Sequence, residues 1–239
     1  MRSLFAGMMI AALSSEASLA QEAPRPVRTL IASARLASVA HAPMHFVVAR
    51  IDLEKAQAVT LSGAESFLYL LSGRVALSGA GEVRALAAGA GAYLSADLRA
   101  SAQNNGARPA RLLRLSLVPA AALGALSPGG SGKVTEMFRT AAAIPHLEAG
   151  PYEFSLTKVT SPPKVKPPLH HRSGAAIYYV LQGTATLHTE SASEPRKAGA
   201  VQYEPNGFIH TWENSGGVPL VLLQANLSRE GAPEIIWLR

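Results

Sequence analysis

The sequence contains no cysteine and few charged residues. Without cysteine the chain has neither disulfides nor thiol chemistry, so its stability depends on packed cores. Charged residues make up 16% and hydrophobic residues 48% of its 239 positions. The chain is therefore too apolar to be disordered and long enough for two modest domains.

Runs of adjacent lysine and arginine with interleaved aromatic residues are also missing from the sequence, although its net charge is +6 and its pI is about 9.8. The basic excess lies in residues 21–145, whereas residues 146–239 contain eight acidic and eight basic residues. Ordinary solvated surface charge accounts for this distribution, so we expect no nucleic-acid binding.

No apolar run reaches the roughly 20 residues that a membrane-spanning helix needs. At the N-terminus, Arg2 precedes a short apolar run over residues 4–13 and a stretch of small residues that ends at Ala20. This is the anatomy of a secretory signal peptide. We therefore expect residues 1–20 to be removed and the mature protein to be periplasmic or secreted, without an integral membrane segment. An uncleaved anchor is the alternative.

Residues 199–214 are the most informative stretch of the chain. Glycine and proline set a turn there, and the alternation from Phe208 to Asn214 predicts a strand that directs His210 to one face. The spaced residues are Gly199, Pro205, Gly207, His210 and Asn214. Their spacing resembles the second sequence motif of the cupin superfamily, in which this histidine is a metal ligand.

An internal repeat extends the resemblance to the N-terminal half. A shift of 110 residues aligns 69–73 with 179–183, Gly89 with Gly199 and Asn104 with Asn214. One constant offset across several segments is typical of a duplicated unit. Short segments rich in β-branched or aromatic residues predict strands at 67–71, 74–77, 111–118, 176–181, 184–189 and 218–225. Together with the resemblance, this implies an all-β bicupin, with two tandem cupin jelly-roll β-barrels after a signal peptide.

The expected organisation has five parts. They are a signal peptide at 1–20, an N-terminal extension at 21–40, an N-terminal barrel at 41–118, a linker at 119–145 and a C-terminal barrel at 146–239. The linker has alanines and a Ser-Pro-Gly-Gly segment, which indicate at most one helical turn before residue 132. Residues 27–40 fit either a helix or an edge strand.

The resemblance implies four metal ligands, of which this chain keeps two. Counted back from Gly183, the two early histidine positions fall on Leu169 and His171, the glutamate position falls on Ala176, and the late histidine is His210. A divalent ion normally uses three or four protein ligands, so two imidazoles make a poor site. Further candidate ligands are His170, Glu204, His188 and Glu213. Whether a divalent metal ion binds is left open.

The N-terminal copy has lost both histidines, because Leu61 and Ala100 stand at the positions of His171 and His210. We expect it to act as a structural half that packs against the other barrel. In the C-terminal copy, strand alternation places Tyr178, Trp212 and Gln224 beside the histidines, which predicts a partly apolar cavity suited to a small organic ligand.

Three functions stay open at this point. The expected one is an exported small-molecule-binding protein. The resemblance also implies a metal-dependent dioxygenase-type enzyme, acting on a small organic substrate, if a divalent ion binds. The third is a degenerate barrel kept for protein contacts. A homodimer is likewise left open.

Overall fold

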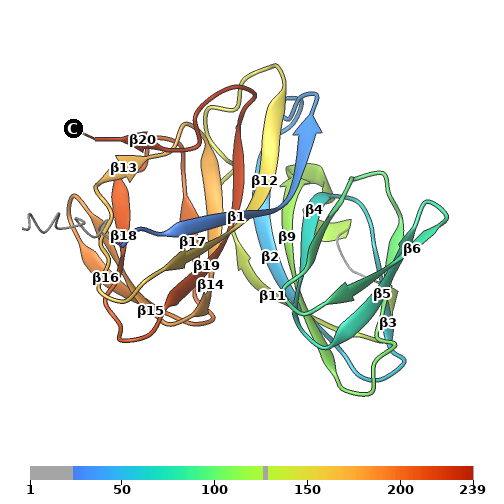
Figure 1. Ribbon diagram of the computed structural model, residues 1–239. Coiled ribbons are helices and arrows are strands. Elements are labelled where there is room, and N and C mark those ends of the chain that lie inside the picture. The colour runs from blue at the N-terminus through green and yellow to red at the C-terminus, as the bar shows by residue number, and fades with distance from the viewer. Residues whose placement is uncertain (1–23, 126–128, 239) are drawn as a thin grey trace, which may run out of the picture.

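The computed structural model describes residues 24–125 and 129–238, so the predicted signal peptide lies outside the described residues. The described chain forms two β-barrels that lie side by side (Figure 1). Each barrel is built from two five-stranded sheets. The prediction of an all-β chain with two tandem barrels is confirmed. No described helix is long and apolar enough to cross a membrane.

The N-terminal barrel combines a sheet of order β11-β2-β9-β4-β7 with a sheet of order β10-β3-β8-β5-β6. Its elements are β2 (Met44–Leu53), β3 (Ala58–Leu61), β4 (Glu65–Ser72), β5 (Arg74–Gly79), β6 (Glu82–Ala87), β7 (Gly91–Leu94), β8 (Ala100–Gln103), β9 (Ala110–Pro119), the 3-10 helix η1 (Ala120–Ala125), β10 (Gly129–Gly130) and β11 (Lys133–Arg139).

The C-terminal barrel combines a sheet of order β1-β12-β19-β14-β17 with a sheet of order β16-β15-β18-β13-β20. Its elements are β1 (Val27–Leu36), β12 (Tyr152–Ser161), β13 (His170–His171), β14 (Ala175–Gln182), β15 (Thr184–Thr189), β16 (Ser193–Lys197), β17 (Val201–Glu204), β18 (His210–Asn214), β19 (Leu220–Arg229) and β20 (Ile236–Trp237).

The internal repeat is visible in the strand bounds, because β4, β5, β7 and β9 begin and end 110 residues before β14, β15, β17 and β19. The repeated asparagine has the same task in both barrels. Asn214 Nδ2 donates to the main-chain carbonyls of Ser161, Pro162 and Val218. Asn104 Nδ2 likewise donates to the carbonyls of Leu53, at the end of β2, and of Arg108, and its Oδ1 accepts from the Gly106 N–H. Each amide therefore fixes the loops at one end of its barrel, which explains why both copies have it.

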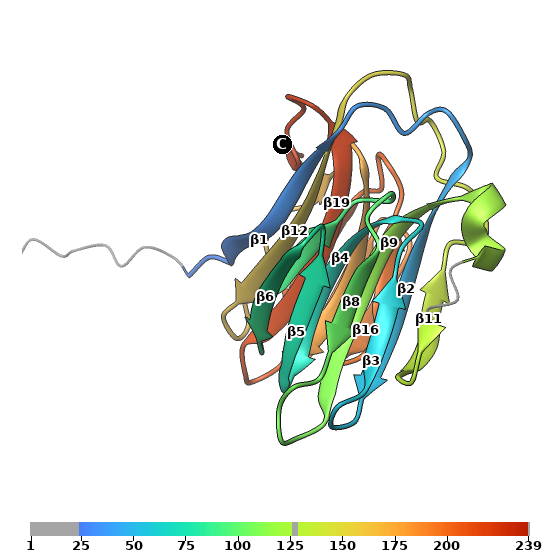
Figure 2. The ribbon, with the colours of Figure 1, turned by 90° about the vertical axis from the view of Figure 1, so that its right-hand side faces the viewer.

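The two barrels exchange their first strands. β1 pairs with β12 and so belongs to the C-terminal barrel, although it precedes the N-terminal one in sequence. β11 pairs with β2 of the N-terminal barrel. Figure 2 shows β1 running alongside β12 at one side of the molecule. Residues 27–36 are thus a strand, and the segment 119–145, expected to be a linker, contains η1 and two strands.

The largest hydrophobic core lies between the barrels, not inside either one. It joins residues of β2, β4 and β9 to residues of β12, β14 and β19, with the rings of Phe67 and Phe154 4.4 Å apart. Inside the N-terminal barrel, aliphatic side chains from β2 to β9 form a second core. The apolar cluster inside the C-terminal barrel is smaller and includes Tyr178 and Trp212. The remaining interior of that barrel holds polar groups.

Candidate functional site in the C-terminal barrel

The structure pairs His210 with His170, where the sequence predicted His171. In the N-terminal barrel, Ala100 pairs with Leu61, and the same offset would pair His210 with His171. The observed partner of His210 is His170, so the pairing of β13 with β18 is shifted by one residue relative to that of β3 with β8, although three residues separate β13 from β14 and β3 from β4 alike. A slip of one residue turns every side chain of a strand to the opposite face.

The slip brings the rings of His170 and His210 together, with their centroids 4.5 Å apart. Both residues are buried. His171 is half-buried, makes a contact from Nδ1 to the carbonyl of Arg172, and does not line the cavity described below. Leu169, at the other predicted histidine position, is 41% exposed. The expected pair of His171 and His210 is therefore corrected to His170 and His210.

Glu204 supplies the carboxylate of the site from an adjacent strand. It lies on β17 directly opposite Ala176 of β14, the position at which the resemblance places a glutamate. Its Oε1 accepts a hydrogen bond of 2.7 Å from Trp212 Nε1. The Nε2 atom of His210 lies 3.0 Å from the same oxygen, with a geometry too poor for a good hydrogen bond. Glu204 and His210 are both fully buried.

Arg172, which the sequence reasoning missed, completes the buried cluster. Its side chain is only 3% exposed, and its Nε lies 3.3 Å from Glu204 Oε2. Its Nη2 donates to Tyr178 Oη and to Gln224 Oε1, and its Nη1 donates to the carbonyl of Glu234. Because inward positions alternate, Arg172 follows His170 to the inside once the register of β13 is known.

The protonation of this cluster follows from burial and pairing. Burial alone raises the pKa of Glu204, but the interactions with His210, Arg172 and Trp212 outweigh it and hold that pKa below its usual value. Burial lowers the pKa of His170 to about 4. The Nδ1 of His170 lies 3.0 Å from the carbonyl of Pro168, so it carries the proton and Nε2 carries the lone pair. At neutral pH, Glu204 is ionised and His170 is neutral.

A cavity of about 490 Å³ lies beside the cluster. Small-molecule sites usually measure about 300 to 1,000 Å³. The apolar wall includes Val159, Trp212, Leu220, Leu222, Ile235 and Trp237. Polar side chains in the lining include Arg25, Arg28, Ser161, His170, Arg172 and Gln224. Tyr178 also lines the cavity, so the three predicted ligand-binding residues, Tyr178, Trp212 and Gln224, lie together there.

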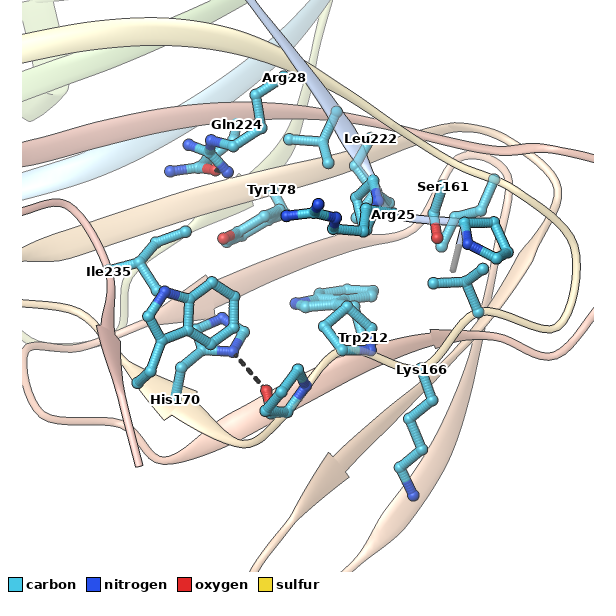
Figure 3. Close-up of a pocket in the computed structure, with 18 of the residues that line it drawn as sticks. Arg25, Arg28, Ser161, Lys166, His170, Tyr178, Trp212, Leu222, Gln224 and Ile235 are labelled. Atoms are coloured by element: carbon cyan, nitrogen blue, oxygen red, sulfur yellow. Dashed lines mark hydrogen bonds between the residues drawn. The ribbon is translucent and has the colours of Figure 1, made fainter. Parts of the chain in front are cut away.

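Both ends of the described chain help to enclose the cavity. Arg25 precedes β1, Arg28 lies in β1, and Ile235 comes directly before β20 (Figure 3). Trp237 of β20 also lines the cavity. Arg28 binds Gln224 Oε1 at 3.2 Å and Glu234 at 2.6 Å. Lys166 also belongs to the lining, but its side chain points away from the cavity in Figure 3. The exchanged strand and the residues just before it thus supply two of the cavity's basic residues.

The residues of the cluster do not fit a divalent metal ion. In the described part of the chain, no three or more His, Cys, Asp or Glu side chains stand close enough to hold one. Glu204 is already paired with Arg172. At an effective dielectric constant of about 20, a divalent ion about 4 Å from the guanidinium would be repelled by about 8 kcal/mol. One carboxylate cannot offset the charges of both cations.

His188 and Glu213, the other candidate ligands from the sequence, lie outside the cavity lining. His188 Nε2 contacts Glu213 Oε2 at 2.6 Å, and His188 Nδ1 contacts Ser193 Oγ at 2.7 Å. This group is partly exposed on the sheet formed by β15, β16 and β18. These side chains are therefore not part of the cluster around His210.

Comparison with known proteins agrees with this architecture. Residues 157–225 match the cupin domain family. No curated protein matches the chain in sequence.

Several solved structures share the fold. Oxalate decarboxylase from Bacillus subtilis, studied for its Mn(II) centres, has 15% identity and a TM-score of 0.57, over 86% of this chain and 74% of that chain. A formate complex of oxalate decarboxylase from Lactobacillus farciminis has 14% identity and a TM-score of 0.57, over 85% of this chain and 88% of that chain. Salicylate 1,2-dioxygenase from Pseudaminobacter salicylatoxidans has 9% identity and a TM-score of 0.54, over 75% of this chain and 71% of that chain. At these identities the similarity shows the fold alone.

Proposed function

Because the chain belongs to the cupin superfamily and has the bicupin fold, we propose that it binds a small organic acid in the cavity of its C-terminal barrel. The orientation of the Gln224 amide carries this proposal. Gln224 Oε1 accepts from Arg28 Nη1 and Arg172 Nη2, each at 3.2 Å. Turning the amide over would set its two N–H bonds against two guanidinium groups. The Nε2 donor, which has no hydrogen-bond partner among the described residues, is therefore left for a ligand.

Other polar groups of the lining also offer hydrogen to a ligand. The oxygen of Tyr178 already accepts from Arg172, which leaves its hydroxyl hydrogen to be donated. Ser161 Oγ is buried and, within the described part of the chain, unpartnered. None of the described residues that line the cavity is acidic. A cavity rich in donors favours a ligand rich in acceptors, and a carboxylate is the common small group that accepts several hydrogen bonds.

The rest of the lining favours an acid whose carboxylate is attached to an apolar group. The rings of Tyr178 and Trp212 lie 5.3 Å apart, and aliphatic side chains of β12 and β19 continue the wall. A volume of about 490 Å³ suits a compact ring. Salicylate, in the name of one fold relative, has this character, whereas oxalate, in the names of two others, has no apolar body. Both belong in a test panel.

Matched acid and amide pairs test the proposal directly. Thermal unfolding is measured with benzoate against benzamide, salicylate against salicylamide, oxalate, a phenol and a sugar, after dialysis against a chelator. A bound ligand at 100 times its Kd adds about 2.7 kcal/mol of stability, which raises the Tm of a chain of this size by about 5 to 10 °C. We expect apolar acids to stabilise the protein and the matched amides to have little effect.

Gln224→Glu provides the decisive variant. A carboxylate at this position still pairs with Arg28 and Arg172, so the protein should fold, but the donor is lost and a negative charge is added. Acid binding should disappear. Gln182→Glu is the control, because Gln182 is exposed and outside the cavity lining. Equal responses to acids and amides, or acid binding that survives Gln224→Glu, would contradict the proposal.

The same measurements separate the other functions. A metal-dependent dioxygenase would need an added metal before the acid binds or reacts. The Tm of a protein that serves only protein contacts would not change with any compound of the panel. Export of the mature protein is a proposal from sequence alone. Its test is N-terminal sequencing of protein from the native host, for which we expect a start at Gln21.

A further inference from the structure

We infer that the guanidinium of Arg172 is a built-in cation that replaces a metal ion in the C-terminal barrel. Arg172 also lines the cavity, but the inference concerns the charges buried in the cluster and does not depend on which ligand the cavity takes.

The carboxylate of Glu204 lies between two nitrogen groups. Its Oε2 lies 3.3 Å from Arg172 Nε, and its Oε1 lies 3.0 Å from His210 Nε2. The His170 ring stacks obliquely on the His210 ring at 4.5 Å. The carboxylate thus has the His210 imidazole on one side, and the cation that contacts it on the other side is a side chain of the protein.

The number of buried charges supports the same conclusion. Arg172 and Glu204 have side chains 3% and 0% exposed, and together they are neutral. A divalent ion bound at Glu204 would add two positive charges beside a buried guanidinium that is held by Tyr178, Gln224 and the Glu234 carbonyl. Such a charge excess is unfavourable in a low-dielectric interior.

The N-terminal barrel also has a buried guanidinium at the corresponding place. There Arg114, at the repeat position of Gln224, is buried and donates to the carbonyl of Ser62, at the repeat position of Arg172. Each barrel thus places one buried guanidinium at this pair of positions, but from opposite members of the pair. That barrel has Leu61, Leu94 and Ala100 in place of the imidazoles and the carboxylate, so none of these three positions offers a metal ligand there.

The test is to remove the built-in cation and measure Co²⁺ uptake, by metal analysis after gel filtration and by the visible absorption of bound Co²⁺. Arg172→His removes the charge and adds a ligand beside His170, Glu204 and His210. We expect about one equivalent of Co²⁺ per chain in this variant, and loss of that Co²⁺ when His210→Ala is added. The unsubstituted protein and the charge-conserving control Arg172→Lys should take up almost none.

Two results would overturn the inference. One is about one equivalent of Co²⁺ in the unsubstituted protein that His210→Ala removes. The other is a folded Arg172→His protein that takes up none. If Arg172→His does not fold, Arg172→Gln serves instead, because it removes the charge and should admit Co²⁺ with lower affinity, and a lack of uptake by it counts equally against the inference. Acid binding is measured on the unsubstituted protein, so either proposal can fail alone.

Discussion

Replacing Glu204 by glutamine should destabilise the protein strongly, because it leaves the buried Arg172 without its carboxylate. Removing one partner of a buried ion pair typically costs about 3 to 5 kcal/mol. In a chain of this size each kcal/mol lowers Tm by about 2 to 4 °C, so we expect a loss of about 6 to 20 °C. Urea unfolding at neutral pH, with fluorescence and circular dichroism as probes, measures the free energy.

The double variant Arg172→Met with Glu204→Gln distinguishes charge from packing. With both charges removed, the interior is neutral again, and we expect most of the lost stability to return. Glu213→Gln is the matched surface control, because Glu213 contacts His188 where both side chains are partly exposed, and such pairs contribute about 1 kcal/mol or less. If Glu204→Gln costs no more than Glu213→Gln, or if the double variant loses as much as the two single variants together, the buried-charge explanation is wrong.

Two further changes probe the same region. Stability should fall as pH drops from 6.5 to about 4, because the unfolded chain protonates His170 while burial keeps the folded ring neutral. The loss in free energy of unfolding should be about 3 kcal/mol smaller in His170→Gln than in the unsubstituted protein. If the stability curves of the two proteins run parallel over this pH range, His170 is not the cause of the loss. Gly174→Ala should cost about 1 to 3 kcal/mol, since an added Cβ would lie 2.8 Å from Ser228 Cα and against the carbonyl of Leu227. Gly217→Ala, with open space around it, should unfold like the unsubstituted protein in urea.

The sequence predicted the fold well because the evidence for it was periodic. The constant offset of 110 residues fixed β4, β5, β7 and β9 against their repeats. At the site the same offset misled the assignment. The chain keeps the offset there, but β13 pairs with β18 one residue out of the register that β3 keeps with β8, so His170 takes the place expected for His171. A sequence offset fixes which residues correspond but not the register in which their strands pair.

Long-range contacts were likewise hidden from sequence reasoning. Nothing near residue 28 indicates that Arg28 will contact Gln224, because that contact depends on β1 joining the sheet of the other barrel. The position of Glu204 opposite Ala176 depends on the pairing of β14 with β17. Strand alternation did turn Tyr178, Trp212 and Gln224 toward the barrel interior, since this property is local to each strand.

The two barrels divide stability and binding between them. At the positions of Tyr178, Glu204, His210 and Trp212, the N-terminal barrel has Leu68, Leu94, Ala100 and Ala102, all within its aliphatic core. Burying such residues stabilises a barrel, whereas buried polar groups without partners destabilise it. In the C-terminal barrel a charged cluster and a cavity replace this apolar core, and donors in the cavity lining have no partner among the residues that the structure describes. Because the strand exchange and the shared core join the barrels, the well-packed half can support a partner whose interior is built for a ligand.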